Sequence, residues 1–78
     1  MELFPNPVID VLQVQTTLKG MLSITFHDAT GRLLRQTDLI FNGGSLIVPV
    51  DVSSLKKGAY IINVQGSGKL QSATFIKQ

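Results

Sequence analysis

Residues 50–65 read VDVSSLKKGAYIINVQ, and this stretch decides the fold class. Apolar residues occupy every second position from Tyr60 to Val64, and a period of two is typical of a half-buried β-strand. Before the strand we expect one short helical turn, which Ser53 would cap and Gly58 would end in the left-handed conformation. The stretch therefore predicts a turn that leads directly into a strand.

A leucine, a glycine and a tyrosine lie close together where this turn meets the strand. We expect Leu55 to be buried beneath the turn, Gly58 to reverse the chain and Tyr60 to begin the strand. The pattern resembles the tyrosine corner of immunoglobulin-like sandwiches, in which the phenol hydroxyl bonds to backbone a few residues upstream. A buried phenol needs such a partner, so we interpret the motif as a structural corner.

The same period of two recurs along the chain, in runs rich in the β-branched and aromatic residues that strands prefer. Turn signals separate the runs at intervals of about 8–12 residues, which is typical of a sandwich or barrel. We predict an all-β, immunoglobulin-like antiparallel β-sandwich of about seven short strands. Six strands are expected at 11–16, 21–27, 32–40, 45–51, 59–65 and 69–77, with a short seventh near Val8.

Turn and edge signals support this arrangement. Residues 42–44 (Asn-Gly-Gly) and 66–68 (Gly-Ser-Gly) predict hairpins, because these residues tolerate the positive φ of primed turns. Charged residues interrupt the strand 32–40, which we expect at a sheet edge. Pro49 has no N–H to donate, so the strand 45–51 should also have an unpaired side.

Composition narrows the class of protein further. The chain has 78 residues, of which 44% are apolar and 15% charged, and we expect one domain over residues 1–78. The absence of cysteine excludes disulfides and thiolate metal sites. Lys56 and Lys57 are the only adjacent cations, and they fit a solvated turn better than the basic stripe of a nucleic-acid-binding protein.

No apolar run approaches the roughly 18 residues that a membrane span needs. The first residues also lack the basic stretch and apolar core of a signal peptide. If the protein is exported, its N-terminal signal is expected elsewhere.

Titratable residues are few and scattered, which argues against an enzyme. The chain has one histidine, one tyrosine and five carboxylates, and we expect no catalytic residue, cofactor or metal. His27 beside Asp28 is expected to be a surface pair. Asp10, Asp28 and Asp51 adjoin strand boundaries but lack the D-x-D-x-D spacing typical of a calcium loop.

The chain opens with a proline-rich segment, Phe4-Pro5-Asn6-Pro7. Both prolines have a fixed φ and no N–H, and Asn6 should be extended because Pro7 follows it. This segment is therefore expected to be a stiff, non-helical lead-in that cannot extend a sheet edge, either as a rigid start to the first strand or as a recognition segment. Residues 1–10 as a whole are expected to form an extended lead-in.

Four stretches together match a known family in order and spacing. They are PNP at 5–7 followed by DVLQV at 10–14, ITFHDATGRLL at 24–34, VDVSSLKKGAYIINV at 50–64, and TFIK at 74–77. The sequence resembles the type A C-terminal sorting domain of the type IX secretion system of Bacteroidetes. The resemblance covers nearly the whole chain.

The resemblance implies a secretion signal and not a catalyst. Such domains follow a fused N-terminal cargo, which a Sec signal takes to the periplasm. The outer-membrane type IX translocon then recognises the folded sandwich, and a sortase-like cell-surface peptidase removes it. The cargo finally reaches the cell surface or the medium.

The family motifs also imply which residues the translocon and the peptidase recognise. They fall on Pro5, Asn6, Pro7, Gly31, Gly58, Tyr60, Ile76 and Lys77. Three positions depart from the family pattern. Phe4 replaces the commoner tyrosine, Thr74 stands where lysine is frequent, and the chain ends in Gln78 and not in a basic residue.

Two further hypotheses concern surfaces. The free edge of the terminal strand could pair with a partner by strand addition, and exposed edges could also cause self-association. The alternative function is a non-catalytic adhesive or carbohydrate-binding module. The lack of tryptophan argues against carbohydrate binding, as does the expected burial of Tyr60, which leaves Phe41 as the one ring expected at the surface.

Overall fold

Seven strands make up the fold of the residues that the structure describes. A computed structural model describes residues 1–41 and 46–78, and within them no helix is present. The strands are β1 (Glu2–Phe4), β2 (Val11–Thr16), β3 (Gly20–Asp28), β4 (Leu33–Phe41), β5 (Leu46–Asp51), β6 (Gly58–Gly66) and β7 (Lys69–Lys77). The predicted all-β class is confirmed.

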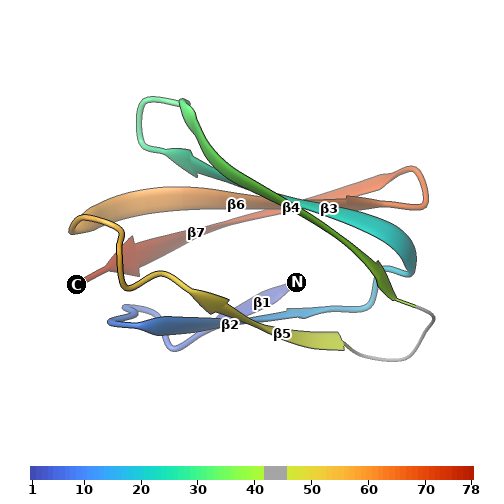
Figure 1. The fold of residues 1–78 in the computed structure, drawn as a ribbon, viewed down its shortest axis with the longest axis horizontal. Coiled ribbons are helices and arrows are strands. Elements are labelled where there is room, and N and C mark those ends of the chain that lie inside the picture. Colours follow the sequence, from blue (N-terminus) through green and yellow to red (C-terminus); the bar gives the residue numbers. More distant parts are fainter. Residues whose placement is uncertain (42–45) are drawn as a thin grey trace.

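The strands form two antiparallel sheets that face each other (Figure 1). One sheet has the order β1-β2-β5 and the other the order β4-β3-β6-β7. The chain therefore crosses between the sheets after β2, after β4 and after β5, as in immunoglobulin-like sandwiches. Both β4 and β5 are edge strands, which confirms the two edge predictions.

The core lies between the sheets, where alternate side chains of each strand meet. Phe75 is fully buried in it, with its ring stacked on Tyr60 at 5.5 Å and edge-on to Phe26 at 6.0 Å. Such aromatic pairs add to the free energy gained from buried area alone. The buried apolar residues are Val8, Leu12, Val14, Leu18, Leu22, Ile24, Phe26, Val52, Tyr60, Ile62, Val64 and Phe75.

The N-terminal segment differs from the prediction. The seventh strand is β1, which pairs with β2, so residues 1–10 are more than a lead-in. Val8 forms only a single parallel bridge to Lys77. The physical reason is that residues 2–4 precede the prolines and keep their N–H groups, while Leu3 packs against the core.

The connection from β5 to β6 also differs. It is a turn without a helix, in which the Leu55 N–H donates to the Val52 carbonyl at 3.0 Å. The side chain of Asp51 caps it by accepting the Ser53 N–H at 2.9 Å, so Ser53 is not the cap. Gly58 has a φ of 151°, which is not the αL value near +57° but is still a conformation that L side chains rarely adopt, so glycine is favoured where β6 begins.

The hairpin between β6 and β7 matches its prediction. Ser67 and Gly68 both have positive φ, 52° and 73°, as a two-residue primed turn requires. Gly66 is needed just before it, because a Cβ there would collide with the side chain of Leu22. The other predicted hairpin, at residues 42–44, lies outside the described residues.

Candidate recognition surface

The predicted recognition residues gather at one end of the sandwich. Gly58 lies opposite Lys77 in the ladder between β6 and β7. Tyr60 lies opposite Asp28 of β3, at the start of the turn that contains Gly31. The β1–β2 loop, the β3–β4 turn, the β5–β6 loop and the C-terminus are all on the left in Figure 1. Motifs that are far apart in the sequence thus share one surface.

At this end, the side chain of Asn6 pairs with the outer edge of β7. Its Nδ2 donates to the Thr74 carbonyl at 3.3 Å, and its Oδ1 accepts the Ile76 N–H at 3.0 Å. A carboxamide offers both a donor and an acceptor, as a peptide group does. Asn6 therefore replaces one residue of a neighbouring strand.

The backbone of Val8 continues this pairing. Its N–H donates to the Ile76 carbonyl, and its carbonyl accepts the Gln78 N–H, both at 2.8 Å. The Val8 side chain is fully buried in the core. We call Asn6, Val8 and their four hydrogen bonds to β7 the β7 latch.

The β7 latch changes the strand-addition hypothesis. We expected the end of the terminal strand to offer a free edge, but Asn6 and Val8 already occupy it between Thr74 and Gln78. Residues 5–8 can do this because the pairing needs only one side chain and one backbone unit. A partner strand could reach this part of β7 only after the latch has moved.

The residues flanking the latch differ in exposure. Pro5 and Pro7 are both exposed, on either side of Asn6. Ile76 points outward and is 43% exposed, whereas Lys77 points inward and is only 8% exposed. The Lys77 Nζ donates to the Gln78 carbonyl at 2.9 Å. Of the terminal pair, Ile76 is therefore the residue whose side chain is exposed to solvent.

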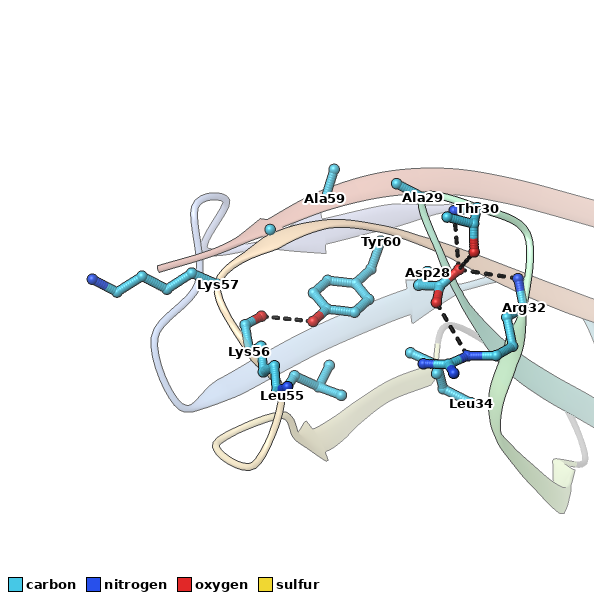
Figure 2. A pocket seen from close by; sticks show the side chains of 11 residues that line it. Asp28, Ala29, Thr30, Arg32, Leu34, Leu55, Lys56, Lys57, Ala59 and Tyr60 are labelled. Atoms are coloured by element: carbon cyan, nitrogen blue, oxygen red, sulfur yellow. Dashed lines mark hydrogen bonds and ion pairs between the residues drawn. The ribbon is translucent and has the colours of Figure 1, made fainter.

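The tyrosine corner is present. The Tyr60 hydroxyl donates to the Lys56 carbonyl at 2.6 Å, and Tyr60 is 7% exposed (Figure 2). Leu55 packs against the core below the turn, although it is only partly buried and not fully buried as predicted. Because its ring is buried and its hydroxyl is bonded, Tyr60 supports the β5–β6 loop from beneath.

The turn from β3 to β4 is organised by one carboxylate. The Asp28 Oδ1 accepts the Thr30 N–H and the Arg32 N–H, each at 3.0 Å, and the Thr30 hydroxyl at 2.5 Å. Gly31 takes the positive φ of 88° that closes this turn. These donors hold the pKa of Asp28 below its ordinary value, and the Thr30 hydroxyl contributes most.

A cleft of about 470 Å³ separates this turn from the β5–β6 loop (Figure 2). Its apolar lining comes from Leu34, Leu55 and Tyr60. Lys56 and Lys57 are among its cationic lining residues. From the sequence they were predicted only to lie in a solvated turn. The cleft leaves no local pattern in the sequence, because its two walls are some 25 residues apart in the chain.

The remaining chemical candidates have structural partners. The His27 Nδ1 lies 3.5 Å from the Asn63 Nδ2, and His27 pairs with no serine nucleophile among the hydrogen bonds of the described residues. Ser53 lowers the pKa of Asp51, chiefly through its hydroxyl. Over residues 1–41 and 46–78, no three metal-binding side chains converge.

One exposure prediction was wrong. The sequence predicted Phe41 as the one exposed ring, but Phe4 is 39% exposed. Phe4 is exposed because β1 is an edge strand and directs this side chain away from the core. The Phe41 side chain lies outside the described residues.

Comparison with protein families matches residues 2–78 to the secretion system C-terminal sorting domain. The chain belongs to this family. A search of curated proteins gave no match. Membership in the sorting-domain family of the type IX system confirms the resemblance seen in the sequence.

Family membership also gives the general function. The sorting domain acts as a C-terminal secretion signal, and the protein that carries it is exported to the cell surface or beyond. Members of such signal-domain families are typically not enzymes. No helix among the described residues has the length and apolarity to cross a membrane.

Proposed function

We propose that this sorting domain directs a fused N-terminal cargo from the periplasm through the outer-membrane type IX translocon. A sortase-like cell-surface peptidase then cleaves the domain from the cargo. The observation that carries this proposal is the family match over residues 2–78, and the convergence of the family motifs at one end of the sandwich supports it.

The motif-bearing end is the surface that the translocon reads. It joins the cargo side of the domain, through Asn6 and Val8, to the last residues of β7. These hydrogen bonds form only when the sandwich has folded and the C-terminus is intact. Reading this end would therefore distinguish a complete, folded domain from an unfolded or truncated one.

The eight motif residues divide into two roles in this proposal. Pro5, Pro7, Gly31 and Ile76 are exposed and would contact the machinery directly. The others hold that surface in shape, through the β7 latch, the tyrosine corner and the start of β6. They are Asn6, Gly58, Tyr60 and Lys77.

The domain is a substrate of the peptidase and performs no chemistry of its own. The Tyr60 hydroxyl is bonded to the Lys56 carbonyl, and the Asp28 carboxylate is bonded within its own turn. These two side chains thus serve the fold.

A secretion assay tests the proposal. Residues 2–78 are fused to the C-terminus of a fluorescent reporter that carries a Sec signal. The fusion is expressed in a Bacteroidetes host with and without its type IX translocon. We expect reporter outside the cell, with the domain removed, only in the strain with the translocon.

Reporter retained intact in the periplasm of both strains would contradict the proposal, provided that the domain has folded. Protease resistance of the retained domain checks folding. Export by a fusion that lacks residues 76–78 would exclude a signal at the C-terminal end.

A further inference from the structure

The residues that line the cleft between the β3–β4 turn and the β5–β6 loop carry a charge equal to the formal net charge of the domain. Arg32, Lys56 and Lys57 line it together with a single carboxylate, that of Asp28. The four other cations and four other acidic residues of the chain cancel each other, so the formal net charge of +2 belongs to this cleft. A surface of this kind attracts anionic groups.

The one carboxylate in the cleft is already bonded. Asp28 accepts hydrogen bonds from Thr30 and Arg32, and its Oδ2 lies 3.3 Å from the Arg32 Nε. The Arg32 side chain remains 76% exposed, and a guanidinium has four further N–H donors beyond Nε. Arg32 can therefore bind a second carboxylate while it keeps its pair with Asp28.

The floor of the cleft is apolar. Leu34, Leu55 and the ring of Tyr60 contribute to it. Lys56 and Lys57 lie on the adjoining loop at the rim, and the Lys57 side chain extends away from the cleft (Figure 2). A volume of about 470 Å³ accommodates a few side chains of a peptide. Cations beside a concave apolar floor suit a ligand that combines negative charge with an apolar group.

We propose that this cleft binds a short acidic segment of a partner protein, with one apolar side chain on the floor and a carboxylate paired to Arg32, while Lys56 and Lys57 attract the segment from the rim. This inference rests on the proposed function, and it gives the chemistry of the segment that the secretion machinery presents. The apolar floor is concave, which favours a peptide whose side chain can enter the cleft. An anionic membrane surface is broad and would instead favour cations that protrude from the domain.

The cleft adjoins the terminal strand, which supports this role. Gly58 and Ala59 line the cleft and lie opposite Lys77 and Ile76 in the ladder with β7. A segment bound in the cleft would thus lie next to the exposed Ile76. One partner could contact the cleft and the C-terminal motif together.

The test uses the purified 78-residue chain and a fluorescein-labelled DELDE peptide. Fluorescence anisotropy gives the affinity, and amide chemical shifts show where the peptide binds. We expect shifts confined to residues 28–34 and 55–60. The double variant K56E/K57E should weaken binding by about tenfold or more, because it reverses two charges at the site.

A matched variant controls for net charge. K19E/K69E makes the same change in charge at exposed positions by the opposite end of the sandwich. Its affinity for DELDE should stay within about twofold of the unaltered chain. A DEGDE peptide should bind more weakly than DELDE, because it lacks the apolar side chain for the floor.

Several results would overturn the inference. They are no binding of DELDE, equal weakening by both double variants, or shifts outside the cleft. Binding to phosphatidylglycerol vesicles without binding to DELDE would favour a membrane and also overturn it. In the secretion assay, export of the K56E/K57E fusion would overturn the inference about the cleft but not the proposed function. Retention of the unaltered fusion in the periplasm would overturn the proposed function.

Discussion

At the scale of single residues, Asn6 shows how one side chain can complete a sheet edge. Its carboxamide bonds two backbone groups of β7 that are 68 and 70 positions away in the chain. The prolines on both sides limit the backbone freedom of this residue before folding, which lowers the entropy cost of fixing it. The PNP motif is therefore explained by the geometry of the β7 latch.

Replacing this side chain should weaken the domain. Asn6→Ala removes both hydrogen bonds, and we expect a loss of about 1 kcal/mol in the free energy of unfolding, since the freed groups can reach water. Urea denaturation measures it. Thr37→Ala, on the exposed part of β4, is the control and should change stability by less than about 0.5 kcal/mol. Equal effects of the two variants would contradict a structural role for the latch.

The Tyr60 hydroxyl is the second residue to test. Tyr60→Phe keeps the stacking on Phe75 but removes the bond to the Lys56 carbonyl. We expect a loss of about 1–2 kcal/mol, because this part-buried carbonyl loses its partner. Urea denaturation gives the loss, and amide shifts at 55–58 should report a loosened loop. An unchanged midpoint would show that the corner contributes nothing to stability.

At the scale of elements, the positions of the strands were predictable from the sequence. Which side chains of each strand face the core was less so. The period of two identified β2, β3 and β6, and the tyrosine corner was visible from Leu55 to Tyr60. In β7 both faces carry apolar residues, so alternation alone did not show that Phe75 faces inward and Ile76 outward.

The elements that were missed depend on contacts between distant residues. The pairing of β1 with β2 and the bond from Asn6 to β7 leave no local pattern in the sequence. The cleft was missed for the same reason, because Arg32 and Lys56 come from different loops. Local patterns gave the strands, whereas tertiary contacts decide the recognition surface.

The two turns organised by carboxylates should make stability depend on pH. Asp28 and Asp51 both have a pKa below the ordinary 3.8, chiefly because of the Thr30 and Ser53 hydroxyls. The folded state then binds fewer protons than the unfolded chain, so this contribution is complete above about pH 4 and is lost as the pH falls through the lowered pKa values.

Thermal unfolding between pH 2 and pH 7 measures this dependence. We expect the midpoint to fall as the pH drops below about 4. Thr30→Ala should make the acid-side fall shallower, because it removes the largest cause of the lowered pKa of Asp28. An identical fall in this variant and in Thr37→Ala would contradict the assignment.

At the scale of the whole molecule, bonds between elements cover part of the edges of the two sheets. On one side, Arg35 of β4 donates to the Asp51 carbonyl of β5 at 2.7 Å and joins the two edges. On the other side, the β7 latch covers the end of β7. Hydrogen bonds between elements thus restrict access to the sheet edges on both sides of the sandwich.

Self-association through edges stays a prediction that the latch makes testable. Asn6→Ala frees part of the β7 edge, so we expect its weight-average mass to rise with concentration more steeply than that of Thr37→Ala. Light scattering over a concentration series measures the mass. The same slope for both variants would show that the β7 edge takes no part in association.

The direction of the chain in the β7 latch has a mechanical consequence. Val8 bridges Lys77 in parallel, so tension between the two chain ends would shear their hydrogen bonds, which then share the load. Tension reaches β1 first and the latch second. In optical tweezers we expect the intact domain to yield at higher force than Asn6→Ala. A cargo pulled from its N-terminal side would then load the hydrogen bonds to the end of β7 together, so that they resist the pull until they break as a group.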